Sequence, residues 1–217
     1  MGAIARNIAN NITTAGVFTS SALNSSSVTG ITELANASDG ITFISSQTAS
    51  NSASLSFTSG LTSTYKAYKF VFSLIRPRTD NQTFQFNLST DSGSNYNVTK
   101  TSINFVSFHN ETDTSTNLVT SDTLEQSTSY QTLTSAGGVG NGADEACSGS
   151  MTLFNPSSTT YVKHYIANTN HYHRSTSSFI INTFVGGYGN TTSAINAIRF
   201  QMTSGNFDGT IYLYGIK

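Results

Sequence analysis

The sequence predicts an all-β protein, a jelly-roll-like antiparallel β-sandwich with an extended N-terminal arm. Three observations favour this fold class. Apolar residues alternate with polar ones in about ten segments separated by turn-like breaks, no long helix is evident, and Ser, Thr and Asn make up 88 of the 217 residues. Thr supports strands, whereas Ser and Asn support turns and loops. Short strands at even spacing are typical of a sandwich or jelly roll.

Residues 1–38 differ from the rest and are expected to form an extended arm. They carry single apolar residues among Ser, Thr and Gly, too few to build a core alone. A disordered tail is the alternative, because chain termini are often disordered. In the arm hypothesis the segment anchors the protein on a partner through its spaced apolar side chains, which are Ile4, Ile8, Ile12, Val17, Phe18 and Leu23.

Residues 39–217 are predicted to form the sandwich domain. The segment TFQFNLST alternates cleanly, which places Phe84, Phe86 and Leu88 together on one face of a strand. Pro77 and Pro156 lie at the ends of predicted strands, where a missing N–H is tolerated. Other strands are expected in GITFIS, ASLSFTS, YKAYKFVFSLI, SINFVSF, SYQTL, SGSMTLFN, TTYVKHYIAN, SSFIINTFVGG, AINAIRFQM and GTIYLYGIK. Residues 109–129 and 135–149 are interpreted as long loops, which in a compact domain are usually functional or mobile.

The last segment, GTIYLYGIK, has apolar or aromatic residues on both faces of its predicted strand. If Ile211 and Leu213 fill the core, then Tyr212, Tyr214 and Ile216 point away from it. Aromatic residues are favoured at the centres of protein interfaces, where a tyrosine buries area and keeps a hydroxyl for hydrogen bonding. We therefore expect Tyr212, Tyr214 and Ile216 to contact another subunit.

The charge content limits the classes of function. Charged residues make up 10% of the chain with a formal net charge of -1, against about 25% charged residues in an ordinary domain. Near-neutral proteins tend to associate, and scattered cations, locally dense only in RPR at 76–78, disfavour nucleic-acid binding. The first residues show no apolar signal-peptide core, and the run YKFVFSLI is far short of the roughly 20 residues that span a bilayer. We expect no membrane insertion.

The sharpest candidate for a metal site is NHYHR. His171 and His173 share one face of a strand, and two imidazoles at that spacing can hold a divalent metal with a third ligand, for which His109 or Glu111 is the candidate. A polar outer face or a subunit contact is the alternative interpretation. We favour the alternative, and expect no metal and no cofactor.

Other patterns are weaker. Paired carboxylates can hydrolyse a glycan. The acidic residues considered for this role fall in predicted loops, where the sequence does not set the distance between them; they are Glu111, Asp113, Asp122, Glu125, Asp144 and Glu145. We therefore expect no catalytic residues. GGVGNG lacks the following helix of a dinucleotide fold and suits a loop with positive φ. Cys147 has no neighbouring histidine and is interpreted as a small buried or loop residue. DSGSNY lacks the closing Glu of a calcium loop and predicts a tight turn.

Several blocks of the sequence resemble structural proteins of tailed bacteriophages, especially marine ones. They are MGAIARNIANNITTAGVFTSSAL, YKFVFSLIRPRTDNQTFQFNLSTDSGSNY, MTLFNPSSTTYVKHY and AINAIRFQMTSGNFDGTIYLYGIK. The resemblance covers most of the chain except the two predicted loops, and its motifs are structural rather than catalytic. It implies a place in a virion, on the particle surface and assembled in the host cytoplasm, which also suits a surface-like composition without an export signal.

The sequence thus predicts a non-enzymatic virion structural protein that forms a homotrimer. It is expected to be a capsid decoration or cement protein, or a short head fibre, held by its arm on the major capsid protein or another virion protein. A tail fibre is the first alternative. The second is a module that recognises a host surface glycan, for which Tyr130, Tyr172 and Tyr188 near the predicted loops are candidate contacts.

Overall fold

The computed structural model describes residues 40–217 except 121–122, 135–136 and 174–178. The predicted fold class is confirmed: the described residues form strands, turns and loops without a helix, and the strands build two antiparallel sheets. The proposed anchoring residues lie outside the described residues; they are Ile4, Ile8, Ile12, Val17, Phe18 and Leu23.

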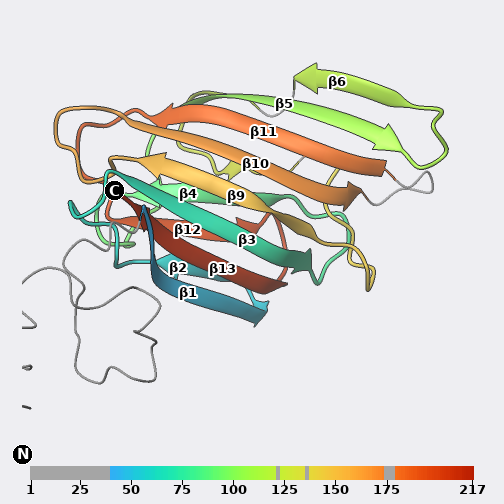
Figure 1. The fold of residues 1–217 in the computed structure, drawn as a ribbon, viewed down its shortest axis with the longest axis horizontal. Helices are drawn as coiled ribbons and strands as arrows, with labels where there is room; N and C mark the ends of the chain where they lie inside the picture. Colours follow the sequence, from blue (N-terminus) through green and yellow to red (C-terminus); the bar gives the residue numbers. More distant parts are fainter. Residues whose placement is uncertain (1–39, 121–122, 135–136, 174–178) are drawn as a thin grey trace, which may run out of the picture. The chain divides into compact units, whose positions relative to one another are not determined.

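The larger sheet has nine strands in the order β1-β13-β3-β9-β10-β11-β5-β6, with β7 also pairing with β5. Figure 1 shows this sheet as the broad front layer, with β1 and β6 at its two edges. Its strands are β1 (Ile41–Ser52), β3 (Ala67–Pro77), β5 (Lys100–Asn110), β6 (Thr116–Thr120), β7 (Leu124–Ser127), β9 (Cys147–Phe154), β10 (Lys163–His173), β11 (Phe179–Gly189) and β13 (Phe207–Ile216).

The smaller sheet has four strands in the order β2-β12-β4-β8 and lies behind the larger one in Figure 1. Its strands are β2 (Ser54–Phe57), β4 (Phe84–Ser89), β8 (Gln131–Thr132) and β12 (Ala197–Met202). Strands β1 and β2 are separated by one residue, so the chain passes from the larger sheet to the smaller one at that point.

Phe200 of β12 is the centre of the core between the sheets. Its ring centroid lies 5.3 Å from those of Phe70 and Phe72 on the larger sheet, and 5.9 Å from that of Phe84 beside it on the smaller sheet. All four rings are buried. Aromatic pairs at these separations add to the free energy gained from burial, so this cluster fixes how the two sheets pack.

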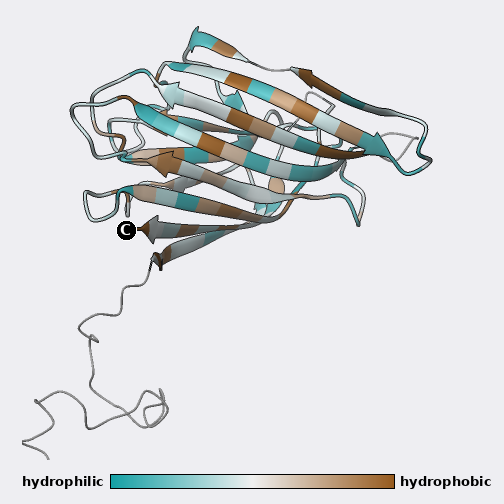
Figure 2. Cartoon of the chain, turned by 45° about the horizontal axis from the view of Figure 1, so that its top comes forward, coloured by the Kyte–Doolittle hydropathy of each residue, from teal (hydrophilic) through white to brown (hydrophobic). Residues whose placement is uncertain are grey.

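The predicted orientation of β13 is also confirmed, because Ile211 and Leu213 are fully buried in the core. Side chains alternate along the strands of the larger sheet, and Figure 2 shows the resulting pattern of hydrophobic and hydrophilic residues. The opposite face of the larger sheet, which we call the outer face, therefore carries the remaining half of the residues of each strand.

The two predicted loops are less open than expected. Residues 109–129 contain β6 and β7, which extend the larger sheet beside β5. The segment around β8 covers the inner side of β5 and β10 through polar contacts, in which Thr169 donates to the carbonyl of Leu133 and Asn104 donates to Thr132. Strands β6 and β7 lack strong apolar patterns, which is why the sequence alone suggested a loop at residues 109–129. Strand β8 lies in SYQTL, which the sequence predicts as a strand, and the second predicted loop, 135–149, ends in β9, which begins at Cys147.

Replacing Phe200 with alanine should lower the free energy of unfolding by about 3–5 kcal/mol, because a buried ring would leave a cavity among the rings that join the sheets. Urea denaturation measures this loss. Leu118→Ala is the control, because Leu118 is 65% exposed and should change stability by about 0.5 kcal/mol at most. Equal losses in the two variants would contradict this description of the core.

Candidate functional site

The outer face of the larger sheet carries very few charges. Among its strands, the only Asp, Glu, Lys and Arg side chains outside the core are Lys69, Arg76 and Asp208 on β3 and β13, and Glu125 on β7, which pairs with β5. Lys100 and Lys163 belong to the same sheet but point inward and are buried. The face consists instead of Ser, Thr and Asn with aromatic and aliphatic side chains among them.

One apolar group on this face, the β1–β13 patch, is formed by Ile41, Phe43, Tyr212, Tyr214 and Ile216. The strands pair Ile41 with Ile216 and Phe43 with Tyr214, and the Phe43 and Tyr214 rings meet edge to face at 5.7 Å. Ile41 is 57% exposed and Phe43 is 56% exposed. The structure thus places the three residues predicted for the oligomer interface on one surface and adds two residues from β1.

A second apolar group, the β5–β11 patch, lies toward the other side of the outer face. It is formed by Ile103, Phe105, Ile166 and Phe184, whose strands β5, β11 and β10 are adjacent. The Phe105 and Phe184 rings stack at 4.7 Å, and Ile103 and Ile166 both remain about half exposed. Sequence reasoning missed this patch, although single apolar residues on the outward face of SINFVSF and YIAN could have indicated it.

An irregularity in β3 creates a polar pocket at the end of the outer face. The registers of β3 with β9 and with β13 both shift near Leu74, which has a φ of 52° and is 68% exposed. A positive φ is rare for a bulky residue and costs about 1–3 kcal/mol. Across the strand Gly209 makes room for this bulge, because a Cβ there would lie 2.6 Å from the Leu74 carbonyl oxygen.

The bulge decides which way the end of β3 points. It lets Ile75 enter the core and directs Arg76 outward, opposite Asp208 of β13. Without it, simple alternation from Ser73 would place Ile75 outside and Arg76 in the core. The extra residue therefore places the arginine on the outer face and not in the core between the sheets.

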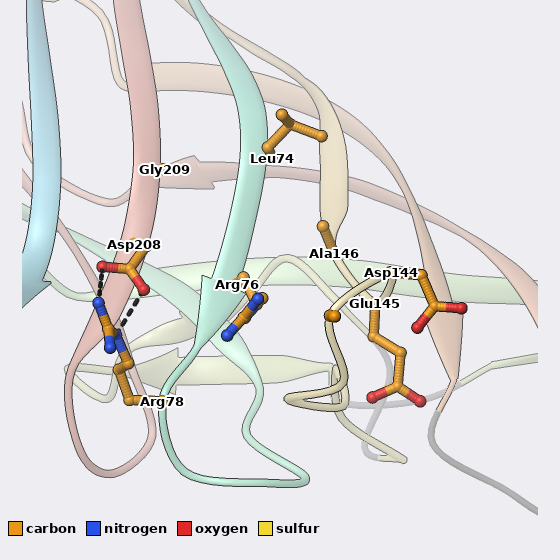
Figure 3. Close-up of a pocket in the computed structure, with 9 residues that line it drawn as sticks. Leu74, Arg76, Arg78, Asp144, Glu145, Ala146, Asp208 and Gly209 are labelled. Carbon is orange, nitrogen blue, oxygen red and sulfur yellow. Dashed lines mark hydrogen bonds and ion pairs between the residues drawn. The ribbon is translucent and has the colours of Figure 1, made fainter.

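The pocket has a volume of about 610 Å³ and is lined by both signs of charge. Figure 3 shows Arg76 between the Arg78–Asp208 ion pair on one side and the acidic residues Asp144 and Glu145 on the other. Arg78 and Asp208 form two contacts, and hydrogen bonding between them lowers the pKa of Asp208 and raises that of Arg78. The remaining lining residues are Leu74, Ala143, Ala146 and Gly209.

The glycine-rich segment GGVGNG shapes the acidic side of this pocket. The Gly142 N–H donates to the Glu145 carboxylate at 2.6 Å, and a Cβ at Gly140 would lie 2.1 Å from the same carboxylate. Gly138 has a φ of 73°, in line with the predicted loop conformation. The glycines therefore allow the loop to close around Glu145, while Asp144 stays exposed.

The histidines of NHYHR do not form a metal site with His109, which was one candidate for the third ligand. His171 is buried on the inner side of β10, where burial first and the neighbouring His173 second lower its pKa to about 3. His109 is half-exposed on the outer face, where it contacts Asp113 at 2.9 Å. Within the described part of the chain no three His, Cys, Asp or Glu side chains gather to hold a metal ion.

Two other candidates have structural roles. Asp91 of DSGSNY accepts hydrogen bonds from Ser89 and from Asn95, which lower its pKa to about 2, so its carboxylate closes a turn as predicted. Cys147 is fully buried, as one of the two interpretations expected, and burial raises its pKa to about 12.

The tyrosines considered for a glycan site do not converge. Tyr188 pairs in register with His164 at one end of β10 and β11, whereas Tyr172 pairs with Ile180 at the other end. Tyr130 lies next to β8 and belongs to neither strand. A single sugar site built from these three rings is therefore not formed.

No protein-family model, curated protein or solved structure matches this chain. The described residues include no helix long and apolar enough to cross a membrane.

A buried lysine is the most unusual ionisable group that sequence reasoning missed. Lys100 of β5 is fully buried, and its ammonium donates to the Asn87 side chain on β4 and, at 2.8 Å, to the Val98 carbonyl. Burial lowers its pKa from the ordinary 10.5 to about 7. The contact joins the two sheets and makes stability depend on pH.

The sign of this dependence follows from the two pKa values of Lys100. Between pH 7 and 10.5 the unfolded chain binds a proton on Lys100 that the folded chain largely lacks, so stability rises with pH and is lost as pH falls toward 7. Relative to Lys100→Met, the wild type should gain about 2 kcal/mol of unfolding free energy between pH 7 and pH 9. Denaturant titrations at both pH values measure this gain.

Comparing the wild type with a single variant cancels the titration of other groups, including Cys147 and Tyr165. The control is Lys66→Met, which removes an exposed lysine from outside the core and so measures the effect of losing a surface lysine at both pH values. A pH-independent difference between the wild type and Lys100→Met would show that Lys100 is fully charged in the folded protein.

Proposed function

We propose that this protein is a non-enzymatic structural component of a tailed-phage particle, which assembles through the outer face of its larger sheet. The proposal rests on one observation: the outer face of the larger sheet is nearly uncharged and carries the β1–β13 and β5–β11 patches. An isolated soluble domain normally covers such a face with charged side chains. Contiguous exposed apolar groups with a polar surround are typical of protein–protein contacts.

The arrangement of the patches suits a homotrimer. Each copy has two separate apolar surfaces on one face, so it can contact two neighbours, as every member of a closed ring does. Few charges on the face also mean that identical neighbours do not repel one another. Phe43, Tyr212 and Tyr214 supply aromatic anchors of the kind that dominate interface energetics.

The resemblance of the sequence to structural proteins of tailed phages suggests the kind of particle. In this proposal residues 1–38 attach the protein to the major capsid protein or another virion protein, and assembly takes place in the host cytoplasm. A compact β-sandwich with a nearly uncharged face suits lateral contacts on a repeated lattice, as in a capsid decoration protein or short head fibre on the virion surface. A receptor-binding tail fibre is the alternative.

Changing both Tyr212 and Tyr214 to serine should weaken self-association while the monomer stays folded. Each lost interface anchor typically costs about 2 kcal/mol or more in binding, whereas both side chains lie outside the core. Sedimentation equilibrium at micromolar concentration measures the change. Tyr161→Ser is the matched control, since Tyr161 is 69% exposed and lies outside the strands of the sheet. A wild-type protein that is entirely monomeric would contradict the proposal.

The number of copies per virion distinguishes a position on the head from a position on the tail. A decoration protein must cover a repeated lattice, so quantitative mass spectrometry of purified particles should find tens to hundreds of copies per virion. About six or about eighteen copies would instead place monomers or trimers around a sixfold tail. Absence of the protein from purified particles would refute the structural role itself.

A further inference from the structure

We propose that the pocket beside the β3 bulge binds a saccharide unit. The site goes beyond the proposed assembly role, because its residues belong to neither apolar patch. Its walls come from β3, β13 and the segment before β9. Its volume of about 610 Å³ lies within the range of pockets that hold small ligands.

The backbone around the pocket is specialised. Leu74 keeps a positive φ and an exposed side chain on a strand whose other large apolar residues are mostly buried. Bulges and backbone outliers of this kind are concentrated next to binding sites, where they redirect a side chain. Here the redirected side chain is Arg76, and Leu74 itself forms an apolar rim beside it.

Two charged side chains of the pocket are available to a ligand. Arg78 and Asp208 neutralise each other, and Glu145 is engaged by the N–H of Gly142. By contrast, the Arg76 Nε is buried without a hydrogen-bond partner, its guanidinium interacts with Asp208 only through their charges, and the Asp144 side chain is exposed. Figure 3 shows Arg76 on the β3 side of the pocket and Asp144 on the side of the segment that precedes β9.

A saccharide fits these groups better than an anion does. Neighbouring hydroxyl groups both accept and donate, so a sugar can accept from the Arg76 guanidinium and donate to the Asp144 carboxylate. The exposed Leu74 offers a surface for the C–H face of the ring. The pocket has three carboxylates against two guanidinium groups, so a phosphate or a polyanion would meet net repulsion.

Saturation-transfer NMR on the full chain tests the site with a panel of methyl glycosides of the neutral sugars glucose, galactose, mannose and N-acetylglucosamine. The variants are Arg76→Gln and Asp144→Asn, which remove one charge from each side of the pocket. Their controls are Lys66→Gln and Glu111→Gln, which remove the same charges from exposed positions outside it. Melting curves establish that each variant is folded.

At least one glycoside should bind the wild type and both controls, and each pocket variant should bind it about tenfold more weakly or worse, as expected for a lost hydrogen bond to a charged group. Asp144→Asn keeps the test decisive if Arg76→Gln does not fold, because Asp144 is an exposed loop residue.

Three results would overturn the assignment. They are binding of no glycoside in the panel, wild-type affinity in either folded pocket variant, and binding of inorganic phosphate or an acidic peptide in place of any glycoside. None of these results depends on self-association, so failure of the saccharide site is distinguishable from failure of the assembly proposal.

Discussion

The contact between the two sheets through Phe200 is the interaction on which the rest of the structure depends. The four-stranded sheet covers one side of the larger sheet, and the aromatic cluster at its centre fixes which residues of β3 and β13 point inward. Once Ile211 and Leu213 are committed to the core, alternation directs Tyr212, Tyr214 and Ile216 outward. Packing of the core does not require the outward side chains to be apolar, so the apolar patches of the outer face need a separate explanation.

The pocket depends on the same alternation, but through its interruption. One extra residue in β3 brings Ile75 into the core and Arg76 to the outer face, and Gly209 on β13 leaves the space for it. The strained Leu74 is stabilised only by the packing around it. Core, outer face and pocket thus share β3 and β13, so a substitution such as Gly209→Ala would disturb the pocket without touching a charged residue.

The sequence predicted what depends on local patterning and missed what depends on strand order. Alternation was sufficient for the all-β class, for the buried faces of β4 and β13, and for the outward direction of Tyr212 and Tyr214. It could not show that Phe43 lies beside Tyr214, or that His109 and His171 lie on opposite sides of the sheet, because pairing between distant segments is non-local. The bulge that redirects Arg76 also has no local signal in YKFVFSLIRPR.

The most direct test of the central claim is a reconstruction by electron cryo-microscopy of purified particles or of the isolated oligomer, with the sandwich fitted into the map. We expect the outer face of the larger sheet to meet density from neighbouring subunits, with Phe43 and Tyr214 inside one contact and Phe105 and Phe184 inside another. A map in which the whole outer face borders solvent, while copies meet through other surfaces, would contradict the claim.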